Sequence, residues 1–257
     1  MKSILAAAAA LLGAAILLSG CGKADDSSTL IVATEATFPP YEFRDKGEIV
    51  GFDIDIVRLV AEKLGRKMKV EDTKFDSIIA HVVTGKAHVG ASGITVTEER
   101  AKKVLFTIPY ETAAQRIIVP KGSKIVGKED LKNNVRIGCQ AGTTAYDYIR
   151  QNIIPDKNSP LIQQYDNGCL AVEALKAGKL DAVVLDEGPA ATLVSQNMDS
   201  LILLDVPLTK EEYAFALNRK DLELCKAFNE VILELRKTGK LRELKDKNQK
   251  IADSQEK

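Results

Sequence analysis

The stretch that decides the fold is AVEALKAGKLDAVVLD, residues 171–186, in which a helical pattern leads through Gly-Lys into a strand. A second stretch, IIAHVVTGKAHVGASG at residues 78–93, repeats this order. Eight residues after the glycine of each Gly-Lys pair lie Gly93 in one stretch and Asp186 in the other. Open α/β sheets bind ligands at the carboxyl ends of their strands. Unless the repeat arose by chance, the sequence predicts two similar lobes whose strand ends line one cleft.

The rest of the chain continues this alternation of strands and helices. Residues 41–52 have the pattern of a hairpin, and Asp53 is predicted to cap the helix that follows. Strand patterns cover 29–35, 67–72, 87–92, 135–140, 162–165 and 180–186, and helical patterns cover 53–65, 76–84, 143–152, 169–178 and 189–197. Such alternation predicts an α/β fold with parallel sheets flanked by helices.

The first residues predict export and attachment to a membrane. Lys2 precedes an apolar run of 15 residues, which small residues follow. This run is too short to span a bilayer comfortably and is typical of an export signal, with a membrane-spanning anchor as the alternative. The tetrapeptide LSGC, residues 18–21, resembles the bacterial lipobox, in which the cysteine is lipidated. We therefore expect a signal peptide at 1–20, a lipid on Cys21, a polar tether at 21–28 and an extracytoplasmic, lipid-anchored protein.

The composition excludes several classes of function. Lys and Arg together number 36, as do Asp and Glu, so no basic surface for nucleic acid is indicated. The two histidines, His81 and His88, lack the neighbours of a metal site, and the common nucleotide-binding and hydrolase motifs are absent. We expect no metal and no cofactor. The remaining cysteines are expected to be buried free thiols, with a Cys139–Cys169 disulfide as the alternative; they are Cys139, Cys169 and Cys225.

Five segments together resemble a known family. They are ATEATFPPYEF (33–43), VGFDIDIVRLVAEKLG (50–65), SGITVTEERAKKVLFTIPY (92–110), AGTTAYDY (141–148) and LDAVVLDEGP (180–189). Their types and order are similar to the extracytoplasmic solute-binding proteins of polar amino acid ABC importers. The resemblance implies a two-lobed periplasmic-binding-protein fold of type II, with two parallel-rich sheets and a hinge of two crossover strands. It further implies lobe 1 at 29–113 and 214–250, lobe 2 at 114–213, and a flexible tail at 251–257.

The same resemblance implies how an amino acid is held by its backbone groups. Arg100 matches the arginine that binds the α-carboxylate, and a planar guanidinium offers two parallel donors for that purpose. An ion pair on the helix surface with Glu98 or Glu99 is the alternative. Gly93, Thr95 and, less closely, Ser92 match positions that bond the ligand's backbone groups.

Lobe 2 and the aromatic residues would complete the site. Thr144 would donate hydroxyl and amide hydrogens to the carboxylate at a helix N-terminus. Asp186 would bind the α-ammonium, unless it serves only as a helix cap. Phe38 and Phe75 match the two positions that sandwich the ligand's side chain, and either could instead be plain core.

Glu35 matches an acidic position that reaches toward the ligand's distal end. A carboxylate beyond two aromatic faces would pair with the distal charge of arginine, lysine, ornithine or histidine. We therefore expect a basic amino acid, arginine first. Glutamine is the alternative ligand, and a Glu35 that points to solvent is the alternative structure.

The resemblance implies a monomeric binding protein that delivers its ligand to a membrane permease and is not an enzyme. Two other classes use related scaffolds. A dehydratase would need a general acid, for which Glu35 is the obvious candidate. A sensory module could use the same closing lobes without any permease.

Overall fold

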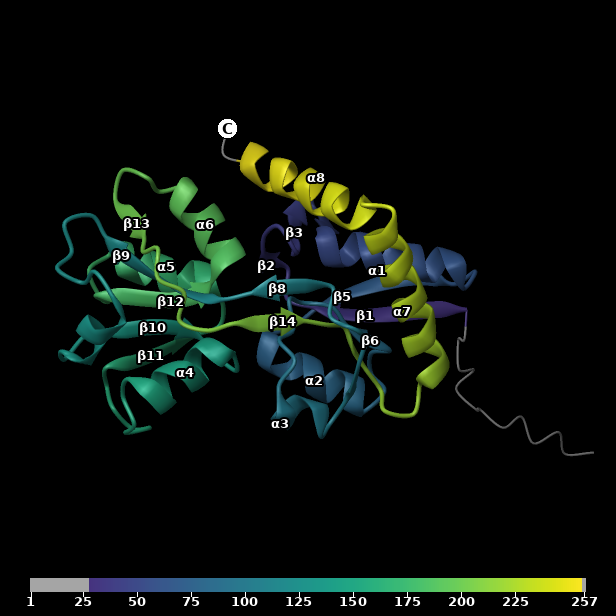
Figure 1. Cartoon of the computed structure of the whole chain (residues 1–257), viewed down its shortest axis with the longest axis horizontal. Helices are drawn as coiled ribbons and strands as arrows, with labels where there is room; N and C mark the ends of the chain where they lie inside the picture. The colour runs from purple at the N-terminus through teal and green to yellow at the C-terminus, as the bar shows by residue number, and fades with distance from the viewer. Residues whose placement is uncertain (1–27, 256–257) are drawn as a thin grey trace, which may run out of the picture.

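The computed structural model describes residues 28–255, which form two α/β lobes placed end to end (Figure 1). The expected signal peptide, Cys21 and the tether up to residue 27 lie outside the described residues. Within residues 28–255, no helix is both long enough and apolar enough to cross a membrane. The three cysteines of this part are free thiols: Cys139 and Cys225 are buried and Cys169 is half-buried.

Lobe 1 is built on a five-stranded sheet in the order β5-β1-β6-β15-β7. Its strands are β1 (Thr29–Thr34), β5 (Lys67–Asp72), β6 (Val89–Gly90), β7 (Leu105–Phe106) and β15 (Ala216–Leu217). The first three are parallel, whereas β15 runs antiparallel to both of its neighbours. The expected hairpin forms a small separate sheet of β2 (Thr37–Phe38), β3 (Glu42–Asp45) and β4 (Glu48–Val50). The helices are α1 (Phe52–Lys63), α2 (Phe75–Val83), α3 (Glu98–Ala101), α7 (Leu222–Lys237) and α8 (Lys240–Ser254).

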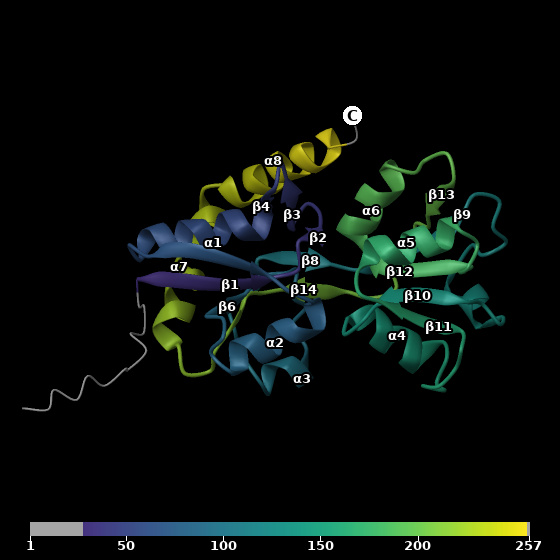
Figure 2. The same cartoon turned by 180° about the vertical axis from the view of Figure 1, so that it is seen from behind.

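Lobe 2 has a second five-stranded sheet in the order β11-β10-β12-β9-β13. Its strands are β9 (Gln115–Pro120), β10 (Ile137–Gln140), β11 (Ile162–Tyr165), β12 (Ala182–Asp186) and β13 (Leu201–Leu203). Its helices are η1 (Lys128–Lys132), α4 (Thr144–Asn152), α5 (Gly168–Lys176) and α6 (Glu187–Ser195). Alternate residues of β12 lie on opposite faces of the sheet. Val184 belongs to the same hydrophobic cluster as residues of α4, and Val183 to the same cluster as residues of α5 and α6. Helices thus cover both faces of the sheet (Figure 2), and the predicted α/β class is confirmed.

The start of α1 differs from the prediction. The helix begins at Phe52, and Gly51 at the N-cap has a φ of 141°. A Cβ on Gly51 would lie 2.0 Å from the Tyr41 carbonyl oxygen, so only glycine fits this close approach. Asp53 therefore lies inside the first turn and does not cap the helix. Its carboxylate instead accepts hydrogen bonds from the Gly93 amide at 3.0 Å and the Tyr110 hydroxyl at 2.6 Å.

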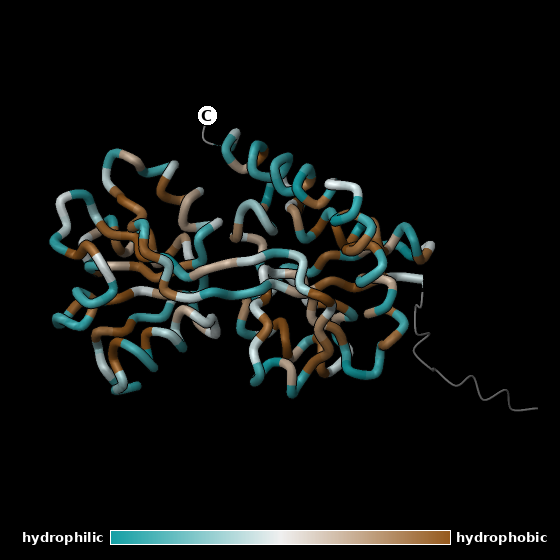
Figure 3. The backbone as a smooth tube through the Cα atoms, viewed as in Figure 1, coloured by the Kyte–Doolittle hydropathy of each residue, from teal (hydrophilic) through white to brown (hydrophobic). Residues whose placement is uncertain are grey.

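The C-terminal helices return to lobe 1, where α7 packs against α1 and α8 follows it (Figures 1 and 2). The tail that we expect to be flexible from residue 251 is helical as far as Ser254, so this prediction is wrong for those residues. The reason is burial, because Ala252 is only 1% exposed. Coloured by hydropathy, α8 is mostly hydrophilic along its outer face, while the strands of both sheets are largely hydrophobic (Figure 3).

Two short strands connect the lobes. β8 (Glu111–Ala113) and β14 (Glu211–Tyr213) pair antiparallel and run between the two large sheets in both views (Figures 1 and 2). An isolated bridge between Thr95 and Tyr213 joins this pair to the polar loop after β6. We propose that β8 and β14 are the hinge, which would divide the chain into lobe 1 at 29–113 and 214–250 and lobe 2 at 114–213.

Candidate ligand site between the lobes

A narrow cavity lies between the lobes. Every ligand-binding residue that the sequence predicts lines it, together with two residues that the prediction missed; the lining is Glu35, Phe38, Phe75, Ser92, Gly93, Thr95, Arg100, Gln140, Thr143, Thr144 and Asp186. Most of these residues stand where a strand ends. Glu35 follows β1, Gly93 lies just after β6, and Gln140 and Asp186 are the last residues of β10 and β12. The repeat in the sequence thus leads to the two sides of one cavity.

Arg100 reaches from α3 across the space between the lobes. Its guanidinium donates to the Thr95 carbonyl at 2.8 Å and to the Gly142 carbonyl of lobe 2 at 3.0 Å. The guanidinium carbon lies 5.4 Å from the centroid of the Phe75 ring. The alternative role as a surface ion-pair partner is wrong, because Glu99 pairs instead with Lys103 at 2.8 Å. Burial lowers the pKa of Arg100, with Asp186 acting in the opposite direction, but a guanidinium stays charged at neutral pH.

Asp186 is a buried carboxylate at the end of β12, 5% exposed. It accepts a short hydrogen bond from the Tyr213 hydroxyl of β14. Although it occupies the N-cap position of α6, its side chain makes no capping hydrogen bond there. Burial, with the nearby charge of Glu211 adding to it, raises the pKa of Asp186 to about 6. The carboxyl group is therefore free of a helix-capping role and faces the cavity.

Glu35 also points inward. It is 7% exposed, so the alternative of a side chain in solvent is wrong. Its carboxylate accepts from the Thr37 hydroxyl at 2.6 Å and, more weakly, from the Gln140 amide at 3.4 Å across the lobes. Burial raises the pKa of Glu35, because the charged form loses its water. No Lys or Arg among residues 28–255 forms an ion pair with it.

The loop after β6 is held in place from behind. Ser92 accepts a hydrogen bond from the Glu35 amide at 3.1 Å and donates to Glu42 at 3.2 Å. Gly93 has a φ of 51°, and a Cβ there would lie 2.8 Å from the Phe38 ring. Glycine therefore lets this aromatic ring approach the backbone at the cavity wall. Phe38 is 8% exposed and Phe75 is half-buried, and both contribute ring atoms to the lining.

Three features of lobe 2 differ from the prediction. Gln140 and Thr143 line the cavity and were not predicted, although the strand-end rule would have found Gln140 at the end of 135–140. The Thr144 hydroxyl donates to Glu211 at 2.9 Å and so is not free to donate to a ligand. A ligand carboxylate at this place would therefore accept hydrogen bonds from the backbone N–H groups at the start of α4 and not from the Thr144 hydroxyl.

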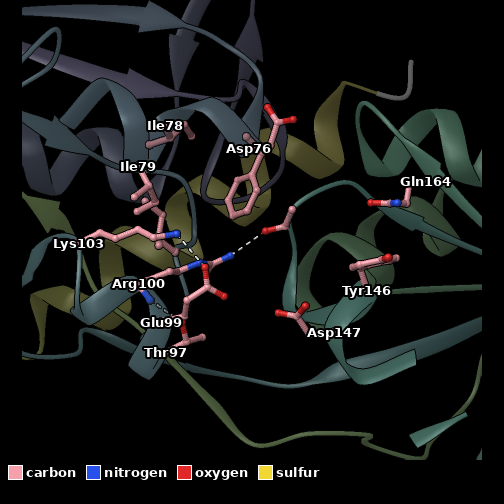
Figure 4. A pocket seen from close by; sticks show the side chains of 13 residues that line it. Asp76, Ile78, Ile79, Thr97, Glu99, Arg100, Lys103, Tyr146, Asp147 and Gln164 are labelled. Atoms are coloured by element: carbon pink, nitrogen blue, oxygen red, sulfur yellow. Dashed lines mark hydrogen bonds and ion pairs between the residues drawn. The ribbon is translucent and has the colours of Figure 1, made fainter. Parts of the chain in front are cut away.

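A wider groove of about 370 Å³, partly open to solvent, lies on the outer side of Arg100 and Phe75. Figure 4 shows Arg100 crossing between its two walls, with Ile79 on the lobe 1 side and Asp147 and Tyr146 on the lobe 2 side. Both Arg100 and Phe75 border the inner cavity as well. These two side chains therefore form the boundary between the enclosed cavity and the outside.

The fold and this enclosed, charged cavity between two lobes define a solute-binding protein. The chain belongs to the bacterial extracellular solute-binding proteins of family 3, which it matches over residues 30–250. It is 30% identical to the L-cystine-binding protein TcyJ of Escherichia coli K12 over 228 residues, 88% of this chain and 84% of TcyJ.

Two solved structures are more similar in sequence. The arginine-bound form of truncated ArgBP from T. maritima is 37% identical, with a TM-score of 0.74 over 81% of this chain and 96% of that one. An ancestral arginine-binding protein bound to glutamine is 37% identical, with a TM-score of 0.79 over 86% and 97%. The predicted family and its two-lobed fold are confirmed, and an enzyme is set aside because the family consists of solute-binding proteins. The family is extracellular, which indicates an extracytoplasmic location.

Proposed function

We propose that this protein captures a basic L-amino acid, arginine first, between its lobes and delivers it to the permease of an ABC importer. This proposal rests on the charges around the cavity, which are one guanidinium, Arg100, and two buried carboxylates, Asp186 and Glu35. A basic amino acid has one carboxylate, one α-ammonium and one distal cation. It therefore offers an opposite charge to each of the three groups.

The α-carboxylate would bind to Arg100 and the α-ammonium to Asp186. In the closed structure the guanidinium donates to two backbone carbonyls, and a carboxylate is a stronger acceptor because it is charged. Asp186 has a hydroxyl partner but forms no ion pair with any described residue, so an ammonium would supply the opposite charge. Thr95 and Gly93 line the same part of the cavity from lobe 1.

The side chain of the ligand would lie against Phe38 and Phe75 and end at Glu35. Aromatic faces attract cations, and an unpaired buried carboxylate disfavours an aliphatic ligand. The arginine-bound structure of a relative supports arginine. Glutamine is the second candidate, because an amide could donate to Glu35 and because another relative is bound to glutamine.

Closure of the lobes would convert binding into a signal for the permease. Lobe 1 contributes Arg100 and Glu35, lobe 2 contributes Asp186 and Gln140, and the ligand contacts both sets only when the lobes meet. A ligand shifts the population toward the closed state by as much as it prefers that state. We propose a monomer whose closed form the permease recognises. A permease gene beside that of this protein would favour import over a sensory module.

We also propose that a lipid on Cys21 anchors the protein to the membrane, which the LSGC sequence supports. Cys21→Ser should prevent labelling by a radioactive fatty acid in cells and move the protein from the membrane fraction to the exported soluble fraction. Cys169→Ser, a change in lobe 2 well after the lipobox in the sequence, is the control and should change neither. Continued membrane retention of the Cys21→Ser protein would contradict the anchor.

Arg100→Ala should weaken every α-amino acid ligand alike, because all share the carboxylate. Removing one partner of a desolvated charge pair costs ~2–5 kcal/mol, a loss in affinity on the order of a hundredfold or more. Asp186→Ala should act similarly through the ammonium. Titration calorimetry measures both, with Lys103→Ala, an exposed cation one turn from Arg100, as the control. If either variant binds the ligand within about threefold of the parent's affinity, the replaced residue does not contact the ligand.

Glu35→Gln should change which amino acid is preferred. The substitution keeps the shape but removes the charge opposite the distal cation, so arginine should weaken by much more than glutamine. Calorimetric titration of parent and variant with both amino acids measures the ratio. Glu48→Gln, an exposed acid in lobe 1, is the matched control. The proposal of a basic ligand would be contradicted if the parent does not bind arginine or lysine, or if the variant binds them as tightly as the parent does.

The affinity should fall as the pH is lowered through about 6, the raised pKa that burial between the lobes gives Asp186. Below this value Asp186 is protonated before binding and must release its proton to pair with an ammonium, so the affinity should drop by about tenfold per pH unit. The raised pKa of Glu35 acts in the same direction. Calorimetry in two buffers of different ionisation enthalpy should show proton release near pH 5.5. A constant affinity from pH 7.5 to 5 would show that Asp186 does not bind the ammonium.

A further inference from the structure

Glu211 on the hinge strand β14 is a buried carboxylate that does not line the cavity, and it is 8% exposed. One of its oxygens accepts the hydroxyl of Thr95 at 2.7 Å and the hydroxyl of Thr144 at 2.9 Å. Its other oxygen accepts the hydroxyl of Thr209 at 2.8 Å. Among the ion pairs of the described part of the chain, none includes Glu211.

This arrangement fixes the direction of the threonine hydroxyls. An ionised carboxylate can only accept hydrogen bonds, and a hydroxyl has a single proton to donate. The protons of Thr95 and Thr144 therefore point at Glu211. Both threonines also line the cavity, so the oxygen atoms that they present to a ligand carry lone pairs and no proton. Such oxygens accept from an ammonium and repel a carboxylate.

The position of the carboxylate is itself fixed. Thr209, which binds its second oxygen, accepts a hydrogen bond from the Gln115 amide at 2.9 Å. The Gln115 side chain donates in turn to the Thr144 hydroxyl at 3.2 Å. Glu211 thus has a defined orientation relative to Thr144, and its charge is felt at both Arg100 and Asp186.

We propose that Glu211 is a positioning residue of the ligand site, which orients the Thr95 and Thr144 hydroxyls so that their oxygens accept from the ligand's α-ammonium. Thr95 belongs to lobe 1, Thr144 to lobe 2 and Glu211 to the hinge. The three groups come together only when the lobes are closed, so the oriented pair of acceptors exists only in the closed state. Recognition of the ammonium is thereby coupled to closure.

The test compares Glu211→Gln with Glu212→Gln, which removes the same charge from an exposed side chain on the same strand. The inference rests on the proposed capture of an α-amino acid, and each variant is titrated with L-arginine and with 5-guanidinopentanoate, which is arginine without its α-ammonium. Glu211→Gln should lower the affinity for arginine by about tenfold or more, as expected for a hydrogen-bond partner that loses its charge. The affinity for the analogue should change by less than about threefold. Glu212→Gln should change neither.

An equal loss of affinity for both compounds would show that Glu211 has a merely structural role. If neither affinity changes, Glu211 does not act on the ligand site. If the parent binds glutamine and not arginine, the basic ligand is wrong, while glutamine and its des-amino analogue test Glu211 in the same way. If no amino acid binds, the proposed function fails. The proposal for Glu211 then fails with it, whereas arginine binding that Glu211→Gln leaves unchanged overturns the proposal for Glu211 alone.

Discussion

The cost of burying charge governs this structure. A carboxylate or guanidinium taken from water must find a partner, or its burial is unfavourable. Between the lobes, Glu35 and Asp186 have hydroxyl and amide partners, but no cation of residues 28–255 lies within hydrogen-bonding distance, and burial raises the pKa of each. A solvated ligand with charges of the right sign satisfies these groups and makes the closed state favourable. Selectivity and closure therefore have one physical origin.

The residues behind the cavity meet the same requirement in another way. Asp53 and Glu42 are both buried at 0% exposure, below the loop that contains Ser92 and Gly93. Burial raises the pKa of Asp53 to about 7 and that of Glu42 well above its usual value. Glu42 therefore favours its protonated form and Asp53 is partly protonated at neutral pH, which reduces the negative charge behind the site while the loop keeps its hydrogen bonds.

The sequence was sufficient for the parts of the site that depend on local pattern. Strand ends located Gly93 and Asp186, and the resemblance supplied Arg100, whose place in the short helix α3 follows from the Thr97 cap. The residues that were missed depend on contacts between distant segments. Glu211 acquires its proposed role only when three threonines from the two lobes, Thr95, Thr144 and Thr209, surround it. Likewise, Asp53 has the sequence context of a helix cap, and only the approach of Gly93 and Tyr110 shows its actual partners.

The strand order of lobe 1 has a consequence for biosynthesis. β15 lies between β6 and β7, yet it comes after all of lobe 2 in the chain. When β7 emerges from the ribosome or crosses the membrane, the strand it pairs with has not yet appeared, because β15 is its one partner among the described strands. Lobe 2, by contrast, is a continuous insertion that contains every strand of its own large sheet. The half of the protein that is made first is therefore the last to be finished.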